Sequence, residues 1–138
     1  SYFATSANST IIISRSKDGK EYADKINARW GSWSQIDNII DTIDVVVNCT
    51  SVGFGDQEME SPLSEDEVAN LKKTAIVFDI IYQPLKTKLL EMVDNNGISI
   101  FNGLQMNLEQ AVLAYQYAIK SEISANKIFD IMSNHSKE

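Results

Sequence analysis

The chain has 138 residues, of which 43% are hydrophobic and 22% charged, a composition typical of one soluble globular domain. Its formal net charge of −7 argues against binding to nucleic acid or to an anionic membrane, since both require a positive surface. The single cysteine, Cys49, excludes an internal disulfide and indicates a cytoplasmic location, and the single histidine, His135, gives no reason to expect a metal site or a Ser-His-Asp triad. No signal peptide or membrane helix is expected, because no apolar run approaches about 18 residues.

Strand-like and helix-like stretches alternate along the chain. Short apolar runs predict four buried strands, over residues 10–14, 44–49, 74–81 and 98–101. A weaker signal predicts a fifth strand over residues 32–36. Amphipathic patterns predict helices over 18–29, 64–71 and 85–95, and two more between 104 and 132, broken near 120–124. Local signals place the helix ends: Gly31 closes the first, Ser64 and Glu67 form a capping box, and Pro84 opens the third.

This alternation favours parallel pairing through right-handed crossovers. We therefore predict an α/β fold with a doubly wound, mostly parallel sheet of the Rossmann type, followed by two C-terminal helices. The chain opens on helix-like residues, Tyr2 to Ala4, and then a strand. Because a doubly wound domain begins with a strand and a turn, the first βα unit is expected to be missing.

Two segments at predicted strand ends carry polar groups suited to a nucleotide. Residues Ser14, Arg15, Ser16 and Lys17 follow the first strand, at a place where an arginine accommodates the 2′-phosphate of NADP and an acid prefers NAD. Each bond from Arg15 to phosphate would contribute roughly 1.5–3 kcal/mol, although spacing alone favours a solvated turn with ordinary surface cations.

The second segment runs from Asn48 to Gly53, directly after the strand over 44–49. A polar cluster at such an end, followed by a glycine, suits the wall of a cofactor site, and the alternative is an ordinary turn. The sequence Gly53-Phe54-Gly55 is no phosphate loop, because acids follow it and no GxGxxG exists in the chain.

Two later segments could face a polar substrate. Tyr82 follows the strand over 74–81 and could present its hydroxyl, or it is simply a buried tyrosine. Gln110 shares a helical face with Met106, and its amide could bind a hydroxylated ligand. Met106 by itself would more often be a core residue.

Together, the motifs SRS, NCTSVG, DIIYQPLKT and NGLQMNLEQ resemble, in order and spacing, the C-terminal, NADP-binding half of shikimate dehydrogenase over roughly residues 11–118. The resemblance implies reduction of 3-dehydroshikimate to shikimate by NADPH, in aromatic amino-acid biosynthesis. It also implies ten cofactor-binding residues: Ser14, Arg15, Ser16, Lys17, Asn48, Thr50, Ser51, Gly53, Gly103 and Met106. The substrate-binding residues that it implies are Tyr82 and Gln110.

The chain also departs from the pattern of that family. Gly19 stands where many members carry a second arginine, so the phosphate would rely on Lys17 or Lys20. Phe54 stands where methionine is common, and Asn107 where leucine is common. The family's catalytic Lys and Asp belong to an N-terminal domain that is absent here, and its glycine-rich turn, expected just before Ser1, is absent too.

We therefore expect residues 1–138 to be a single, incomplete NADP-binding domain (1–103) with C-terminal helices (104–133), containing no catalytic residue and inactive alone. Its missing partner would be the N-terminal domain. Two alternatives remain: a quinate/shikimate dehydrogenase that uses NAD, and a non-catalytic module that binds a nucleotide or a partner through the same fold.

Overall fold

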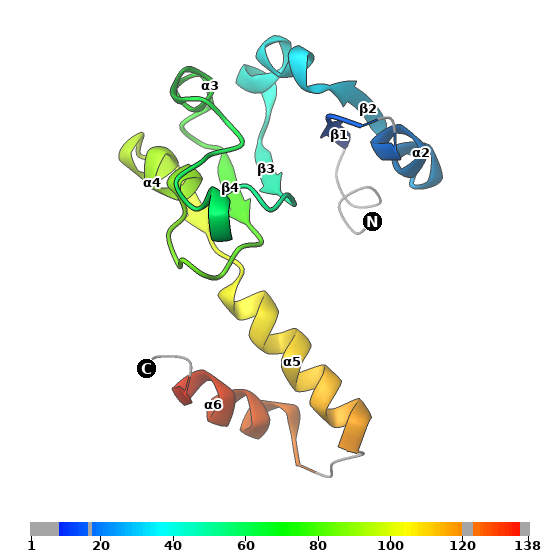
Figure 1. Cartoon of the computed structure of the whole chain (residues 1–138), viewed down its shortest axis with the longest axis vertical. Helices are drawn as coiled ribbons and strands as arrows, with labels where there is room; N and C mark the ends of the chain where they lie inside the picture. The colour runs from blue at the N-terminus through cyan, green and yellow to red at the C-terminus, as the bar shows by residue number, and fades with distance from the viewer. Residues whose placement is uncertain (1–8, 17, 120–122, 136–138) are drawn as a thin grey trace. The chain divides into compact units, whose positions relative to one another are not determined.

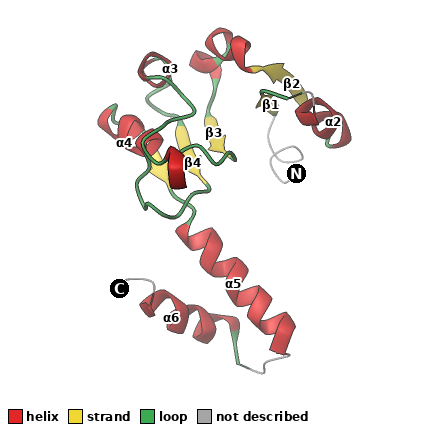
Figure 2. Cartoon of the chain, viewed as in Figure 1, coloured by secondary structure: helices red, strands yellow, loops and turns green. Residues whose placement is uncertain are grey.

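The computed structural model describes residues 9–16, 18–119 and 123–135. The chain forms two compact units, Ser1–Ile43 and Asp44–Glu138. Figure 1 traces both units along the chain, and Figure 2 shows that strands and helices alternate in each. The predicted helix-like start at Tyr2 and the helix break at Lys120 lie outside the described residues. Within the described ranges, no helix is long and apolar enough to cross a membrane.

The first unit contains one βαβ motif. Strand β1 (Ile11–Ser14) leads into helix α2 (Asp18–Lys25) and then into strand β2 (Arg29–Ser32). The two strands pair in parallel, with Ile12 opposite Trp30. The helix packs on both strands through its fully buried Ala23. The predicted strand, helix and parallel crossover are therefore confirmed here.

The prediction was wrong about where α2 ends and β2 begins. The helix stops at Lys25, and Asn27 adopts a left-handed conformation with φ 55°, which asparagine tolerates better than most residues. After this turn the second strand begins at Arg29 rather than at residue 32 as predicted, so Gly31 lies inside β2 and does not close a helix. Residues beyond Ser32 form a 3₁₀ helix, η1 (Trp33–Asn38), where a strand was predicted.

Two short 3₁₀ helices complete the first unit. After η1 comes η2 (Ile40–Thr42), and the two helices bury Ile36 and Ile40. The backbone N–H of Ser32 donates to Oε1 of Gln35 at 2.9 Å, so a side chain satisfies a donor that has no partner within the helix at its start.

The second unit is built on a three-stranded parallel sheet. Its strands, in spatial order, are β3 (Val45–Asn48), β4 (Ile76–Asp79) and β5 (Ser99–Phe101). Asn48 pairs with Asp79 at the carboxyl ends of the two longer strands. The described strands thus form two parallel sheets, with the orders β1-β2 and β3-β4-β5, and the predicted parallel pairing is confirmed within each.

Helices of the second unit begin at side-chain caps. Helix α3 (Glu65–Ala69) starts with the predicted capping box, in which Ser64 Oγ accepts from the Glu67 N–H and the Glu67 carboxylate accepts from the Ser64 N–H. Helix α4 (Lys88–Asn95) begins three residues later than predicted, because Thr87 supplies its cap and accepts from the Leu90 N–H. A short 3₁₀ helix, η3 (Gly55–Gln57), lies in the loop between β3 and α3.

A buried carboxylate joins the loops of this unit. Asp79, at the end of β4, is fully buried. Its Oδ1 accepts from Asn48 Nδ2 and from the Ile81 N–H, both at 3.1 Å, and its Oδ2 accepts from Thr87 Oγ1 at 2.8 Å. A carboxylate is costly to bury unless hydrogen bonds replace its hydration. The three donors therefore fix the end of β3, the loop after β4 and the start of α4 relative to one another.

The chain ends in the two predicted helices, α5 (Leu104–Ile119) and α6 (Ala125–His135), which pack on each other. Gly103, just before α5, donates its N–H to the Ile81 carbonyl at 3.0 Å. A Cβ at this position would lie only 1.9 Å from the Ile80 carbonyl oxygen, so only glycine allows this approach. Large apolar side chains are exposed on both helices, at Leu113, Tyr115, Tyr117, Ile119 and Ile131.

Removing the buried carboxylate should destabilise the chain strongly. In Asp79→Ala, the donors on Asn48, Ile81 and Thr87 lose their acceptor, and we expect the free energy of unfolding to fall by about 3 kcal/mol. Urea unfolding followed by circular dichroism measures this change. Asp44→Ala is the matched control, because Asp44 is 82% exposed in its ion pair with Lys72, and its loss should cost less than about 1 kcal/mol. Equal effects of the two substitutions would contradict the role of Asp79.

A methyl group at position 103 should also be poorly tolerated. Gly103→Ala forces α5 away from the end of β4, and overpacking of this kind costs about 1–3 kcal/mol. The same urea titration measures it. Gln105→Ala, on the exposed side of the first turn of α5, should stay within about 0.5 kcal/mol of the unchanged chain. A Gly103→Ala variant as stable as Gln105→Ala would show that the close approach is not required.

Candidate functional site

The first predicted cofactor segment lies at the carboxyl end of β1. Arg15 and Ser16 are exposed there, Ser14 is half-buried, and Lys17 lies outside the described residues. Arg15 has no ion-pair partner among the residues that the structure describes. Its guanidinium is therefore available to an anion from solution. Lys20, by contrast, pairs with Asp24 at 2.9 Å, so a phosphate would have to compete with that carboxylate for it.

The hydroxyl of Ser14 is engaged inside the protein. It donates to the Ser16 carbonyl at 2.8 Å and accepts from the indole Nε1–H of Trp30 at 2.9 Å. This use of Ser14 differs from the cofactor contact that the resemblance implies. The segment therefore offers Arg15 outward, while Ser14 holds the turn.

The second predicted segment, after β3, divides into inward and outward residues. Asn48 is only 4% exposed, and its Nδ2 donates to the Val52 carbonyl as well as to Asp79. Its Oδ1 accepts from the N–H and the hydroxyl of Thr50. Thr50 Oγ1 in turn accepts from the Val52 N–H at 3.1 Å. Asn48 and Thr50 thus shape the loop from within.

Ser51 and Phe54 form the outward part of this loop. Ser51 is exposed, and Gly53 is buried in a left-handed conformation with φ 106° that favours glycine. Phe54, beyond it, is 56% exposed. A ligand that approaches the carboxyl end of β3 meets Ser51 and Phe54 before it meets Asn48 or Thr50.

Cys49 lies between Asn48 and Thr50 in the sequence. Partial burial raises the pKa of its thiol, and the negative charge of Asp79 raises this pKa further, since both disfavour a thiolate. Cys49 is therefore a poor nucleophile at neutral pH. In the described parts of the chain, no three His, Cys, Asp or Glu side chains lie close enough to hold a metal ion.

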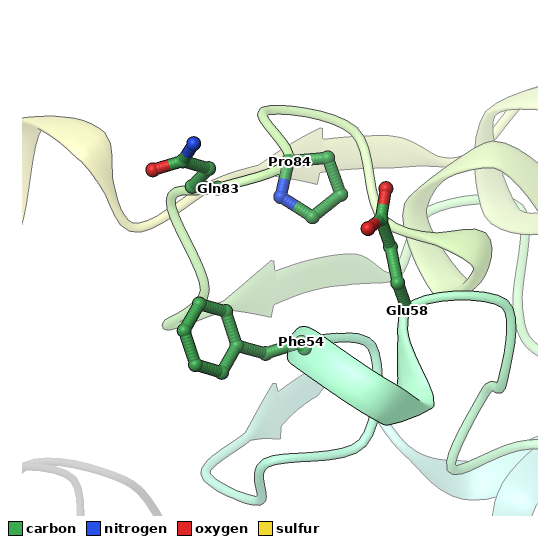
Figure 3. Close-up of a pocket in the computed structure, with 5 residues that line it drawn as sticks. Phe54, Glu58, Gln83 and Pro84 are labelled. Carbon is green, nitrogen blue, oxygen red and sulfur yellow. The ribbon is translucent and has the colours of Figure 1, made fainter.

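A pocket of about 540 Å³ opens between the loops that follow β3 and β4. Figure 3 shows Phe54 and Glu58 on either side of η3, facing Gln83 and Pro84 from the loop after β4. The Glu58 carboxylate points toward the Pro84 side of the pocket. In open α/β sheets, ligands bind beyond the carboxyl ends of strands. The pocket has this position, and Glu58 makes it unfavourable for an anion.

The predicted substrate residues are both exposed. Tyr82, after β4, is 44% exposed, which excludes the alternative of a buried tyrosine. Gln110 is exposed on α5, one turn after the half-buried Met106. Gly103 is buried against the end of β4, which gives it a packing role in addition to the predicted place beside a nicotinamide.

The structure thus brings most predicted residues of the second unit to one edge of its sheet. Gly53 lies near the side chain of Thr87, and Gly103 contacts the segment after β4. Two residues were missed by sequence reasoning: Asp79, which organises the loops of the second unit, and Trp30, which contacts the turn after β1 in the first. The signal for Asp79 was a carboxylate inside the apolar run TAIVFDII, whereas nothing local marks Trp30.

Curated relatives of this chain have one common name. No family model matches the chain. It is 38% identical over 85 residues to a protein named shikimate dehydrogenase (NADP(+)) from Thermosynechococcus vestitus, covering 62% of this chain and 30% of that protein. It is 30% identical over 127 residues to the protein of the same name from Bartonella tribocorum, covering 86% of this chain and 44% of that one.

A solved structure gives the same result for the fold. Shikimate 5-dehydrogenase from Listeria monocytogenes, determined with shikimate and NAD, superposes with a TM-score of 0.69 and 29% identity. The match covers 88% of this chain and 46% of that protein. The chain spans less than half the length of each of these three proteins. In sequence and in fold, it corresponds to a segment of the shikimate dehydrogenases.

Proposed function

We propose that this chain is the cofactor-binding part of an NADP-dependent shikimate dehydrogenase, which reduces 3-dehydroshikimate to shikimate. The observation that carries the proposal is Arg15, exposed at the carboxyl end of β1 and without an ion-pair partner in the described residues. The names of the relatives support the same activity. The chain would act in the cytoplasm as part of aromatic amino-acid biosynthesis.

The described residues fit the adenosine end of NADP. A guanidinium binds phosphate through charge-assisted, often bidentate hydrogen bonds, and Arg15 is free to make them. Ser16 is exposed beside it and can add a hydroxyl contact. In a chain with a net charge of −7, a dianionic 2′-phosphate needs such a local cation, because the overall field repels it.

At the second unit, the loop after β3 and the start of α5 would support the rest of the cofactor. Ser51 and Gly53 would lie along it, shaped from beneath by Asn48 and Thr50. Gly103 and Met106 would lie beside the nicotinamide. When bound, NADPH supplies the hydride, and the residues of this chain would only bind and orient it.

The substrate would be met by Tyr82 and Gln110. A phenol and a primary amide both donate and accept hydrogen bonds, as recognition of a ring with several hydroxyl groups requires. Both side chains are exposed, so neither must break an internal contact to reach a ligand. No group that moves the proton to the substrate is assigned among the described residues; that role would fall to the Lys and Asp that the resemblance implies for the N-terminal domain of the enzyme.

A second candidate cofactor is NAD. The Listeria monocytogenes protein was determined with shikimate and NAD, so the alternative of a shikimate dehydrogenase that uses NAD has a structural counterpart. A carboxylate near the adenosine ribose would favour NAD. At the end of β1 the chain offers Arg15 in that place, which favours NADP.

The chain alone should not oxidise shikimate or quinate. With saturating shikimate and NADP, we expect no increase in absorbance at the nicotinamide band above the rate without protein, because no described residue is assigned to transfer the proton. Replacing NADP by NAD, and shikimate by quinate, tests the alternatives in the same assay. Clear turnover with any of these pairs would show that the catalytic groups lie here.

Arg15 should determine cofactor choice. In Arg15→Ala, we expect the affinity for NADP to fall about 10- to 100-fold, since a charge-assisted contact contributes roughly 1.5–3 kcal/mol. The affinity for NAD should stay within about twofold. Titrations of the labelled chain by NMR measure both affinities. Arg29→Ala, which removes an exposed arginine on β2, is the control and should weaken neither cofactor. Equal weakening of NADP and NAD by Arg15→Ala would contradict the proposal.

A further inference from the structure

A relay of two hydrogen bonds holds the turn that carries Arg15. The indole Nε1–H of Trp30 donates to Ser14 Oγ at 2.9 Å, and Ser14 Oγ–H donates to the Ser16 carbonyl at 2.8 Å. The two ends of the second bond are the residues on either side of Arg15. Trp30 is paired with Ile12 in the sheet, so its indole reaches from β2 across to the end of β1.

Gly19 leaves the room that this relay needs. A Cβ on Gly19 would lie 2.1 Å from Ser14 Oγ and 3.4 Å from Trp30 Nε1. Any side chain at this position would therefore displace the Ser14 hydroxyl from between its two partners. Ser14, Gly19 and Trp30 thus meet in one contact, and its effect is to fix the backbone around Arg15.

We propose that Trp30 is a positioning residue for a 2′-phosphate: through Ser14, it holds the turn from which Arg15 binds this group. The inference rests on the proposed function. Ordering a flexible turn costs free energy when a ligand binds, and a turn that is already held avoids that cost. Because Trp30 acts on the turn of Arg15, its loss should weaken ligands that carry a 2′-phosphate and spare those that lack it.

The relay is also a cooperative unit. Ser14 Oγ accepts one hydrogen bond and donates the other, and each bond polarises the next. Removing either the indole N–H or the hydroxyl breaks the same unit. Trp30→Phe and Ser14→Ala should therefore have effects that do not add, whereas independent residues would show additive effects.

The test uses the whole chain and two probes that differ only in the 2′-phosphate, adenosine 2′,5′-bisphosphate and adenosine 5′-monophosphate. In Trp30→Phe, which keeps an aromatic ring but removes the donor, affinity for the bisphosphate should fall about 3- to 10-fold. Affinity for the monophosphate should stay within twofold. Trp33→Phe is the matched control, since Trp33 is equally half-buried in η1, and it should change neither affinity.

The indole signals give a second readout. The chain has only two tryptophans, so NMR spectra contain two indole N–H signals, each assigned by its Trp→Phe variant. Adding the bisphosphate should shift the signal of Trp30 and leave that of Trp33 in place. A purely structural tryptophan would not report on the 2′-phosphate in this way.

A second variant covers the case in which Trp30→Phe does not fold. Gly19→Ala keeps both tryptophans, displaces the Ser14 hydroxyl and improves the helix propensity of α2. It should lose affinity for the bisphosphate selectively, by the same 3- to 10-fold. Adding Ser14→Ala to either variant should cause little further loss.

The outcomes distinguish the proposed function from the positioning role of Trp30. If the unchanged chain binds both probes equally, the assignment of NADP fails, and this inference fails with it. If the unchanged chain prefers the bisphosphate and the Trp30→Phe and Gly19→Ala variants keep that preference, the proposed function stands and the positioning role of Trp30 is overturned. Equal weakening of both probes would also overturn it, because it would show a structural role alone.

Discussion

The buried carboxylate of Asp79 is the constraint on which the second unit depends. A charge without access to water must receive hydrogen bonds from the protein, and in the described residues the donors to Asp79 come from the end of β3, the loop after β4 and the start of α4. Each donor can satisfy the carboxylate only if its segment lies in one place. The need of Asp79 for hydrogen bonds therefore determines how the loops at this edge of the sheet are arranged.

In both units, some polar side chains of a motif hold the loop through internal hydrogen bonds, and others are exposed and can bind a ligand. In the loop after β3, Asn48 and Thr50 use their polar atoms on each other and on Val52, while Ser51 and Phe54 are left exposed. In the turn after β1, the hydroxyl of Ser14 donates to the Ser16 carbonyl, whereas Arg15 is exposed. Polar residues of one motif therefore have different roles: the internally bonded ones fix the backbone, and this preorganises the exposed ones for binding.

Sequence reasoning found the strands and helices because their signals are local. Apolar β-branched runs mark β1, β3 and β4, and the capping box at Ser64 marks α3 within one residue. It failed where a tertiary contact overrides the local signal. The start of α4 depends on Thr87, whose hydroxyl serves as the cap and also donates to Asp79, and Gly31 belongs to a strand because the chain turns at Asn27.

For the candidate site, the motifs indicated which segments matter but not which way each side chain faces. That Asn48 points inward follows from its register opposite Asp79, and register is a property of the pair of strands. The contact among Ser14, Gly19 and Trp30 likewise requires the parallel pairing of β1 with β2. The sequence of a single segment does not show which strand it pairs with or in what register. The role of Trp30 could therefore not be predicted from the residues around it.

The environment of Cys49 has a practical consequence for the chemistry of the chain. Partial burial and the charge of Asp79 both raise the pKa of its thiol, so the thiolate, which is the form that peroxide and alkylating reagents attack, is scarce at neutral pH. A chain with one cysteine can form a disulfide only with another molecule. The carboxylate that orders the loops therefore also disfavours the reactive thiolate form of Cys49.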